Sequence, residues 1–335
     1  MSPCSLEPEE TKETKKFSMD IFSHAAFQMI ELTLLAAAGV IARKLDFMNS
    51  AFDTALSRLV MNFSLPALMV SSVLNNTGLP DFATIMRILG FSMLAYALMM
   101  VVSYLVPRLY PNIEPATRGA HSFMMGFGNT SFVGLPILNA IFGPAAVFYG
   151  VINNIPFNIF AFTCGESMIR QGGAAKGAPF KRRAKKVLRN LMNPAMIACI
   201  VALVLASLGI TDNGGLVGST LNYIGQMTVP ASMLIIGSTL ATLSPKETLS
   251  HVKPYLTSLV RLLAIPVALF FALRPFIDDP LILGVIVVGA GMPVASMGIM
   301  MALMYDGDVK AMSQGTFITT ILALATIPLL AVLVS

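Results

Sequence analysis

Nearly the whole chain consists of apolar runs separated by short polar connections. A helix needs roughly 20 apolar residues to cross the hydrocarbon layer of a bilayer, which is about 30 Å thick. The chain is 56% hydrophobic and 12% charged, whereas soluble domains carry roughly 25% charged residues. The sequence therefore predicts an all-α polytopic membrane protein with about ten spans. These lie at residues 19–41, 51–74, 82–105, 117–142, 145–168, 191–208, 216–243, 254–273, 281–305 and 311–334.

The distribution of Lys and Arg predicts how the spans are oriented. Cytoplasmic connections carry an excess of basic residues. The segment 170–190, between the fifth and sixth spans, is rich in Lys and Arg, whereas four other connections contain neither. We therefore expect a protein of the cell membrane with the 170–190 loop in the cytoplasm and both termini outside it. The connections without basic residues are 75–81, 143–144, 211–215 and 275–280.

The N-terminal region is expected to differ from the rest of the chain. Residues 1–18 mix acidic and basic side chains and are expected to form a mobile tail. The first apolar run ends in small residues, as signal peptides do, but it is longer than a typical signal-peptide core and similar spans follow it. We therefore expect an uncleaved first helix.

An internal repeat relates the two halves of the chain. A shift of 164 residues places the stretch from Ser64 on that from Thr228, Asn129 on Pro293, and Gly134 on Gly298. Each half then contains five spans, which is an odd number, so the second half enters the membrane from the opposite side. Inverted repeats of this kind are typical of secondary transporters. The predicted units are a first repeat at 19–169, the basic loop at 170–190 and a second repeat at 191–335.

Two corresponding spans contain stretches that disfavour a regular helix. Residues 126–136 in the fourth span and 289–298 in the ninth combine several glycines with proline and polar side chains. A helix that breaks within the membrane presents a new N-terminus, whose free N–H groups and partial positive charge attract anions. The donors at the two breaks would be Asn129, Thr130 and Ser296. The alternative is that the glycines and prolines only kink packed helices.

These motifs resemble those of the auxin efflux carrier family, which includes plant PIN transporters and bacterial carriers of malate or malonate type. The resemblance covers nearly the whole chain after the tail. The plant proteins have a Pro-Asn pair where this chain has Gly128-Asn129, and many have a much longer central loop, so the chain is more similar to a short prokaryotic carrier. The motifs are Gly128-Asn129-Thr130, Gly134-Leu135-Pro136, Met292-Pro293-Val294-Ala295, Leu65-Pro66-Ala67-Leu68 and Asn193-Pro194.

The resemblance implies an architecture and a site. Spans 1, 2, 6 and 7 would form a scaffold and homodimer interface, and spans 3–5 and 8–10 a transport domain whose fourth and ninth helices cross. A small organic anion would bind at that crossover, with its carboxylate held by Asn129 and an amide of the fifth span that best matches Asn153. The site residues implied are Gly128, Asn129, Thr130, Asn153, Pro293, Val294 and Ser296.

Other polar residues within the spans are candidates for gating or coupling, because they are costly in hydrocarbon. Glu31 and His121 are candidates for proton coupling, and Asn62, Gln226 and Asn158 for gating or lining the cavity; packing or interhelical hydrogen bonds would explain them as well. Arg87 and Arg261 would attract anions, extend to a membrane interface or serve as paired structural charges.

Several functional classes are not indicated by the sequence. It contains no phosphate-binding loop, zinc-protease motif or nucleophile with a nearby base, so neither an enzyme nor a cofactor is expected. The three cysteines lack metal-ligand spacing. The net charge of +5 arises from loops without interleaved aromatic residues, so nucleic-acid binding is not expected. Two alternatives to an organic-anion carrier remain: a sodium- or proton-coupled carrier related to bile-acid or cation antiporters, and a membrane sensor without transport.

Overall fold

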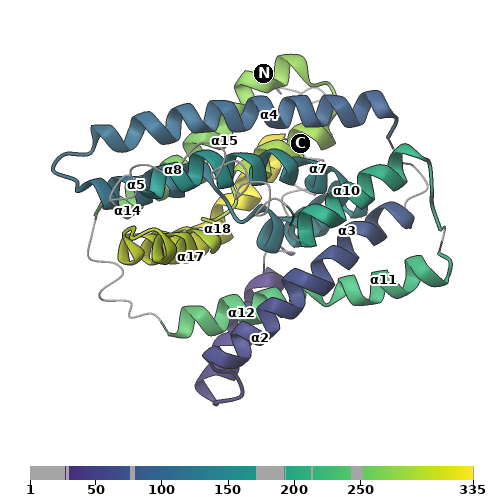
Figure 1. The fold of residues 1–335 in the computed structure, drawn as a ribbon, viewed down its shortest axis with the longest axis horizontal. Coiled ribbons are helices and arrows are strands. Elements are labelled where there is room, and N and C mark those ends of the chain that lie inside the picture. The colour runs from purple at the N-terminus through teal and green to yellow at the C-terminus, as the bar shows by residue number, and fades with distance from the viewer. Residues whose placement is uncertain are drawn as a thin grey trace, which may run out of the picture.

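The computed structural model describes residue 27 and residues 30–75, 80–170, 192, 194–212, 214–242 and 252–334. The predicted tail and nearly all of the basic loop lie outside the described residues. Within them, regular structure is helical apart from one isolated β-bridge (Figure 1). In addition to a helix at 30–44, the elements are α2 (Ser50–Leu59), η1 (Val60–Ser64), α3 (Leu65–Leu74), α4 (Phe82–Leu105), η2 (Val106–Leu109), α5 (Pro115–Gly126), η3 (Thr130–Gly134), α6 (Leu135–Phe142), α7 (Pro144–Phe160), η4 (Ala161–Gly165), α8 (Glu166–Ile169), α10 (Pro194–Ser207), α11 (Leu216–Gln226), α12 (Thr228–Ala241), α14 (Val252–Leu259), η6 (Val260–Ala264), α15 (Ile265–Leu273), η7 (Arg274–Phe276), α16 (Pro280–Ala290), α17 (Met297–Met304) and α18 (Val309–Val334).

Six continuous helical stretches in the described part of the chain are long and apolar enough to cross a membrane. Several consist of two α-helices joined by a π-helical turn, as where η1 joins α2 to α3. Shorter apolar helices account for other predicted spans, at Thr130–Phe142, Pro194–Ser207 and Pro280–Ala290. The six stretches are Ser50–Leu74, Phe82–Leu109, Ala145–Ile169, Leu216–Ala241, Val252–Phe276 and Val309–Val334.

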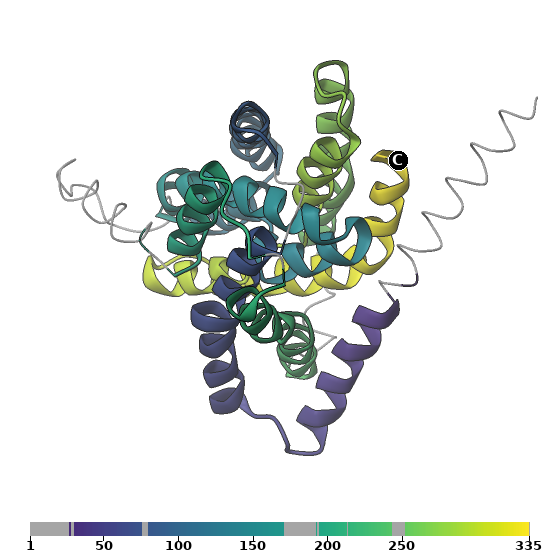
Figure 2. The same cartoon turned by 90° about the vertical axis from the view of Figure 1, so that its right-hand side faces the viewer.

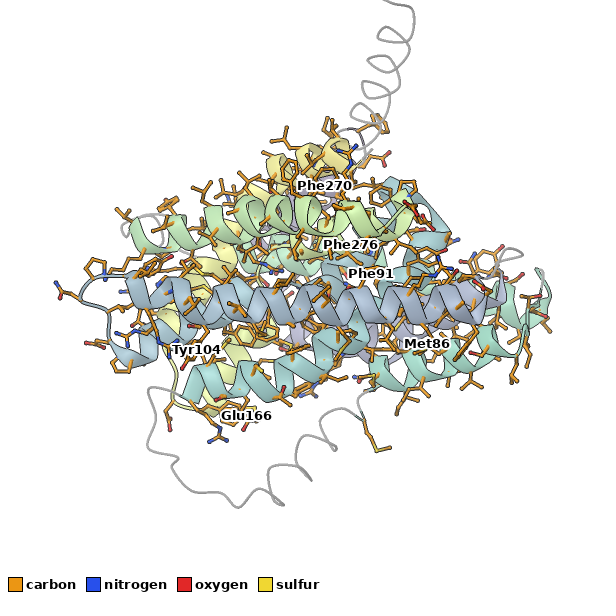
Figure 3. All side chains as sticks on the ribbon, turned by 90° about the horizontal axis from the view of Figure 1, so that it is seen from above. Met86, Phe91, Tyr104, Glu166, Phe270 and Phe276 are labelled. Atoms are coloured by element: carbon orange, nitrogen blue, oxygen red, sulfur yellow. The ribbon has the colours of Figure 1, made fainter. Side chains whose placement is uncertain are left out.

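The exposed surface is apolar along these helices. Figure 3 shows α4 as one straight helix on the outside, with Met86 near one end and Tyr104 near the other. Both side chains are about half exposed, and Phe276 is more exposed still. A water-soluble protein would cover such a surface, whereas lipid solvates it. The chain is therefore a multi-pass membrane protein.

One group of helices stands apart from the main bundle. Helix 30–44 and α2 form the two arms of a V, and α12 lies between them (Figure 2). A Cβ at Gly39 would collide with the backbone of Leu234, so the glycine lets helix 30–44 and α12 touch backbone to backbone. Small residues allow this close packing in membrane helices, where no hydrophobic effect drives helices together.

Several predicted basic connections lie at one end of the molecule (Figure 1, left). The guanidinium of Arg170 lies over the Tyr305 ring, 4.1 Å from its centroid. Lys253 donates to the carbonyl of Asn112 over 3.4 Å. These contacts bring the ends of α8 and α17 together, and the start of α14 to the connection between α4 and α5.

Both predicted helix breaks are present, and the residues explain where they fall. Pro293 has no N–H to donate and disfavours a helical conformation at Met292, so α16 ends at Ala290 and the chain becomes irregular until Met297. The first break runs from Phe127 to Asn129. Pro136 does not break a helix: η3 runs directly into α6, and the π-helical turn before the proline accommodates its missing N–H.

Candidate functional site

The two irregular segments cross and pair with each other. Gly128 and Val294 form an isolated antiparallel β-bridge. The N–H of Asn129 donates to the Pro293 carbonyl over 2.7 Å, and the N–H of Ala295 donates to the Phe127 carbonyl over 3.0 Å. Unwound backbone within a membrane must find such partners inside the protein. The crossover is therefore a defined structure rather than a pair of independent kinks.

Two helices resume on either side of this bridge, and their N-caps meet. Asn129 is the N-cap of η3, where its Oδ1 accepts from the N–H of Phe132 over 3.2 Å. Ser296 is the N-cap of α17. The side-chain Nδ2 of Asn129 donates to Ser296 Oγ over 3.3 Å. Because both helices begin here, their partial positive ends lie at one place, together with an amide and a hydroxyl.

The first break is also anchored to the fifth span. Thr130 Oγ1 donates to Asn154 Oδ1 over 2.7 Å. The Nδ2 of Asn154 is buried and has no hydrogen-bond partner among the described residues. Asn158 donates to the Asn154 carbonyl one turn earlier. Asn153, the amide expected to hold substrate, lies beside Gly289, the first residue of the predicted stretch 289–298, where an added Cβ would be 3.2 Å from its Nδ2. The amide that contacts the crossover at Thr130 is thus Asn154.

A buried arginine lies directly beneath the bridge. Arg261, in η6, is fully buried. Its Nε donates to the Met292 carbonyl over 3.2 Å, and its Nη1 donates to the Met125 carbonyl over 3.1 Å. A Cβ at Gly128 would collide with its Nη2, so any larger residue there would displace the guanidinium. Extension to a membrane interface is therefore wrong for Arg261, whose guanidinium is bonded inside the protein. Its counterpart Arg87 is exposed on α4.

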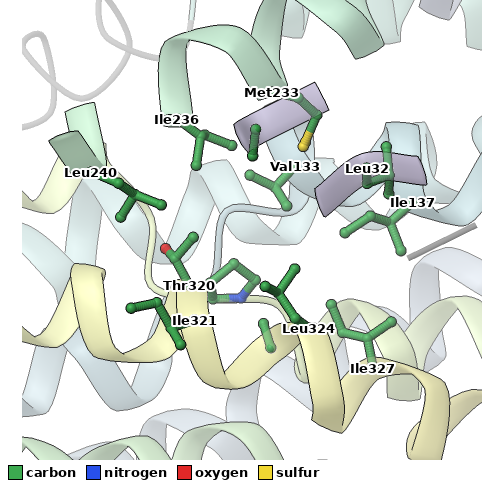
Figure 4. Close-up of a pocket in the computed structure, with 13 residues that line it drawn as sticks. Leu32, Val133, Ile137, Met233, Ile236, Leu240, Thr320, Ile321, Leu324 and Ile327 are labelled. Atoms are coloured by element: carbon green, nitrogen blue, oxygen red, sulfur yellow. The ribbon is translucent and has the colours of Figure 1, made fainter. Parts of the chain in front are cut away.

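An apolar cavity adjoins the crossover on the side of helix 30–44 and α12. Its volume is about 50 Å³. Pro293 forms part of its wall, with Val133 from η3, Leu32 from helix 30–44, Met233 from α12 and Leu324 from α18 (Figure 4). Val294 is held beside it, because its N–H donates to Thr319 Oγ1 of α18 over 3.1 Å. No feature of the sequence pointed to Thr319.

The remaining predicted residues, which were candidates for gating or coupling, do not lie at the crossover. His121 is buried between α5 and α14, where its Nδ1 bonds Thr257 Oγ1 at 2.7 Å. Asn62 is exposed, and its Nδ2 donates to the Arg58 carbonyl of its own helix. Gln226 and Glu31 are also exposed. In the described part of the chain, no three His, Cys, Asp or Glu residues are grouped so that they could hold a metal ion.

Comparisons with known proteins agree with this architecture. Residues 24–331 match a family described as membrane transport protein. An uncharacterized transporter of Methanocaldococcus jannaschii is 24% identical over 302 residues, which is 88% of this chain and 94% of that protein. An uncharacterized transporter of Methanothermobacter thermautotrophicus is 24% identical over 313 residues, 92% of this chain and 98% of that protein. The chain therefore belongs to the membrane transport protein family, that of the auxin efflux carriers, as its motifs indicated.

Proposed function

We propose that the protein is a secondary-active or facilitative carrier of small organic anions, which bind at the crossover of the fourth and ninth spans. The observation that supports this most strongly is the pairing of Asn129 with Ser296, the N-caps of both resumed helices. A carboxylate placed there would meet two partial positive helix ends, one amide and one hydroxyl. In the described residues, neither crossing segment contains an acidic side chain that would repel it.

We further propose ten spans arranged as an inverted repeat, with spans 1, 2, 6 and 7 as scaffold. Two contacts between residues 164 positions apart support this. Asn129 and Pro293 bond across the crossover, and Ser64 Oγ lies 2.7 Å from Thr228 Oγ1. Residues related by a two-fold axis meet when they lie on that axis, so both contacts are expected if the axis passes through them.

Transport would proceed by alternating access. The cavity beside Pro293, at about 50 Å³, is far smaller than the roughly 300–1,000 Å³ of typical ligand pockets. An organic anion therefore requires that helix 30–44 and α12 separate from the crossing segments. The apolar wall formed by Leu32, Val133 and Met233 would then face the carbon skeleton of the substrate, while the crossover holds its carboxylate.

Orientation and assembly complete the proposal. The end of the molecule that carries Arg118, Arg170 and Lys253 would face the cytoplasm, and both termini the outside. The carrier would work as a homodimer in the lipid bilayer, without a cofactor or nucleotide. In the inward-facing state, the transport domain would have moved away from the scaffold, and the cavity would be open at the cytoplasmic end.

A thermal-shift screen of purified protein with mono- and dicarboxylates would identify the substrate, because a ligand that binds the folded state raises its melting temperature. We expect the active carboxylate to stabilise the wild type and an Asn222→Ala variant, but to have much less effect on Asn129→Ala. Asn222 provides the same substitution on α11, outside the crossover. Equal stabilisation of both variants would place the carboxylate elsewhere.

A further inference from the structure

Arg261 joins the C-terminal ends of both helices that stop at the crossover. Its Nη1 donates to the carbonyl of Met125, next to the last residue of α5, and its Nε to the carbonyl of Met292, just beyond α16. The last carbonyls of a helix lack partners within the helix and carry a partial negative charge. One guanidinium thus bonds one carbonyl at each of the two helix ends.

No carboxylate neutralises this guanidinium in the described part of the chain. The salt bridges found there join Arg43 to Asp53 and Arg170 to Glu166. A buried charge is costly unless it is compensated, and two helix C-termini, each equivalent to roughly half a negative charge, supply compensation of the right size. The helix ends and the arginine therefore depend on each other.

One nitrogen of Arg261 is still without a partner. Nη2 is buried and makes no hydrogen bond to any described residue, and it lies against Gly128. An unsatisfied buried donor is costly, so packing alone does not account for an arginine under the crossover. Its two bonds to helix-end carbonyls give the charge a role there.

In transporters with broken helices, the C-terminal ends of half-helices and the unwound carbonyls are the groups that coordinate a coupling cation such as Na⁺. Here the guanidinium of Arg261 already bonds those groups. We propose that Arg261 is a resident cation: it holds the two broken helices together in place of a transported Na⁺, so that the crossover forms without sodium. Arg261 is thus a positioning residue. Sodium-free transport rests on the proposed function, whereas the structural role of the charge does not.

Chemical rescue tests this role directly. Arg261→Ala removes the charge and leaves space for a small cation. We expect a lower melting temperature than wild type, with a large part of the loss restored by low-millimolar guanidinium chloride and not by urea or sodium chloride. Arg87→Ala, the exposed counterpart on α4, should neither lose stability nor respond to guanidinium. Equal effects of guanidinium and urea on Arg261→Ala would overturn the proposal.

A second variant keeps the test decisive if Arg261→Ala does not fold. Gly128→Ala should lower the melting temperature, because its Cβ collides with Nη2. Combining it with Arg261→Lys, which keeps a charge but removes the nitrogen at Gly128, should reduce that penalty. A full Gly128→Ala penalty in the Arg261→Lys background would contradict the assigned geometry.

Sodium dependence separates this inference from the proposed function. The wild-type melting temperature and carboxylate uptake should be the same in sodium and choline chloride. Uptake that requires sodium would overturn the resident-cation role while leaving the carrier function intact. Conversely, rescue by guanidinium without uptake of any carboxylate would support Arg261 as the cation and refute the carrier function.

Discussion

The Nδ2 of Asn129 donates to Ser296 Oγ over 3.3 Å, and each residue occupies the N-cap position of the helix that resumes after one of the two breaks. This distance is long for an N–H···O hydrogen bond, which is usually near 2.9–3.0 Å. A carboxylate is a stronger acceptor than a hydroxyl, so it would compete with Ser296 Oγ for the Asn129 amide. A carboxylate arriving between them would receive both donors.

Ser296→Ala tests whether the hydroxyl contributes to binding. It removes one donor and leaves the backbone bridge intact, so we expect the apparent substrate affinity to fall by about fivefold, as the loss of about 1 kcal/mol implies. Ser296→Thr keeps the hydroxyl and should retain most of the affinity. The concentration dependence of uptake measures both, and an unchanged KM in Ser296→Ala would exclude a role for this side chain.

Thr130 and Asn154 should act as one unit in stability. Thr130→Val and Asn154→Leu each break the same 2.7 Å hydrogen bond, so their effects on unfolding free energy should not add. We expect a coupling of about 0.6–1.7 kcal/mol, the range seen for side-chain hydrogen bonds in membrane helices. Asn153→Leu, combined with Thr130→Val, supplies the control. Additive effects in the Asn154 cycle would show that the bond is unimportant.

Pro293 and Pro136 should differ sharply when replaced. Pro293 ends α16 and presents its carbonyl to Asn129, so Pro293→Ala allows the helix to extend and should reduce uptake severely. Pro136 lies in the first turn of α6, and Pro136→Ala should be tolerated. Initial uptake rates at saturating substrate compare the two variants. Similar losses in both would indicate that the breaks depend on helix packing rather than on Pro293.

Crosslinking distinguishes the proposed rigid and moving parts. In a cysteine-free background, Ser64→Cys with Thr228→Cys joins two scaffold residues that already touch, and uptake should survive a short thiol crosslinker. Met233→Cys with Val133→Cys joins α12 to the crossing segment η3 at the cavity that both residues line, and the same reagent should stop uptake. Transport that persists after complete crosslinking of the second pair would refute the separation of α12 from η3.

Sequence alone predicted the membrane class and the two breaks, and the family resemblance implied that the two broken helices cross. The class and the breaks follow from local properties: long apolar runs must span, and Gly128-Asn129 and Pro293 cannot continue a helix. The 164-residue shift also paired Asn129 with Pro293, which are in contact. The sequence could not show whether Asn153 or Asn154 contacts Thr130. Adjacent residues on a helix differ by about 100° in direction, and only the packing of α7 decides which of the two faces Thr130.

The role of Arg261 could not be predicted from the sequence either. The sequence does not distinguish an arginine that reaches a membrane interface from one whose charge is compensated inside the protein. Its role depends on Met125 and Met292, whose contribution is a backbone carbonyl that any residue would supply. Only the bridge at Gly128 and Val294 brings these carbonyls to one point.

Counterflow of a radiolabelled carboxylate into proteoliposomes tests the central claim most directly. The substrate would be the carboxylate that gives the largest thermal shift, and vesicles would contain wild type, Asn129→Ala or Asn222→Ala at equal protein content. We predict exchange of similar rate in wild type and Asn222→Ala and a loss of at least about tenfold in Asn129→Ala, equivalent to about 1.4 kcal/mol. Wild-type rates in Asn129→Ala would contradict an anion site at the crossover.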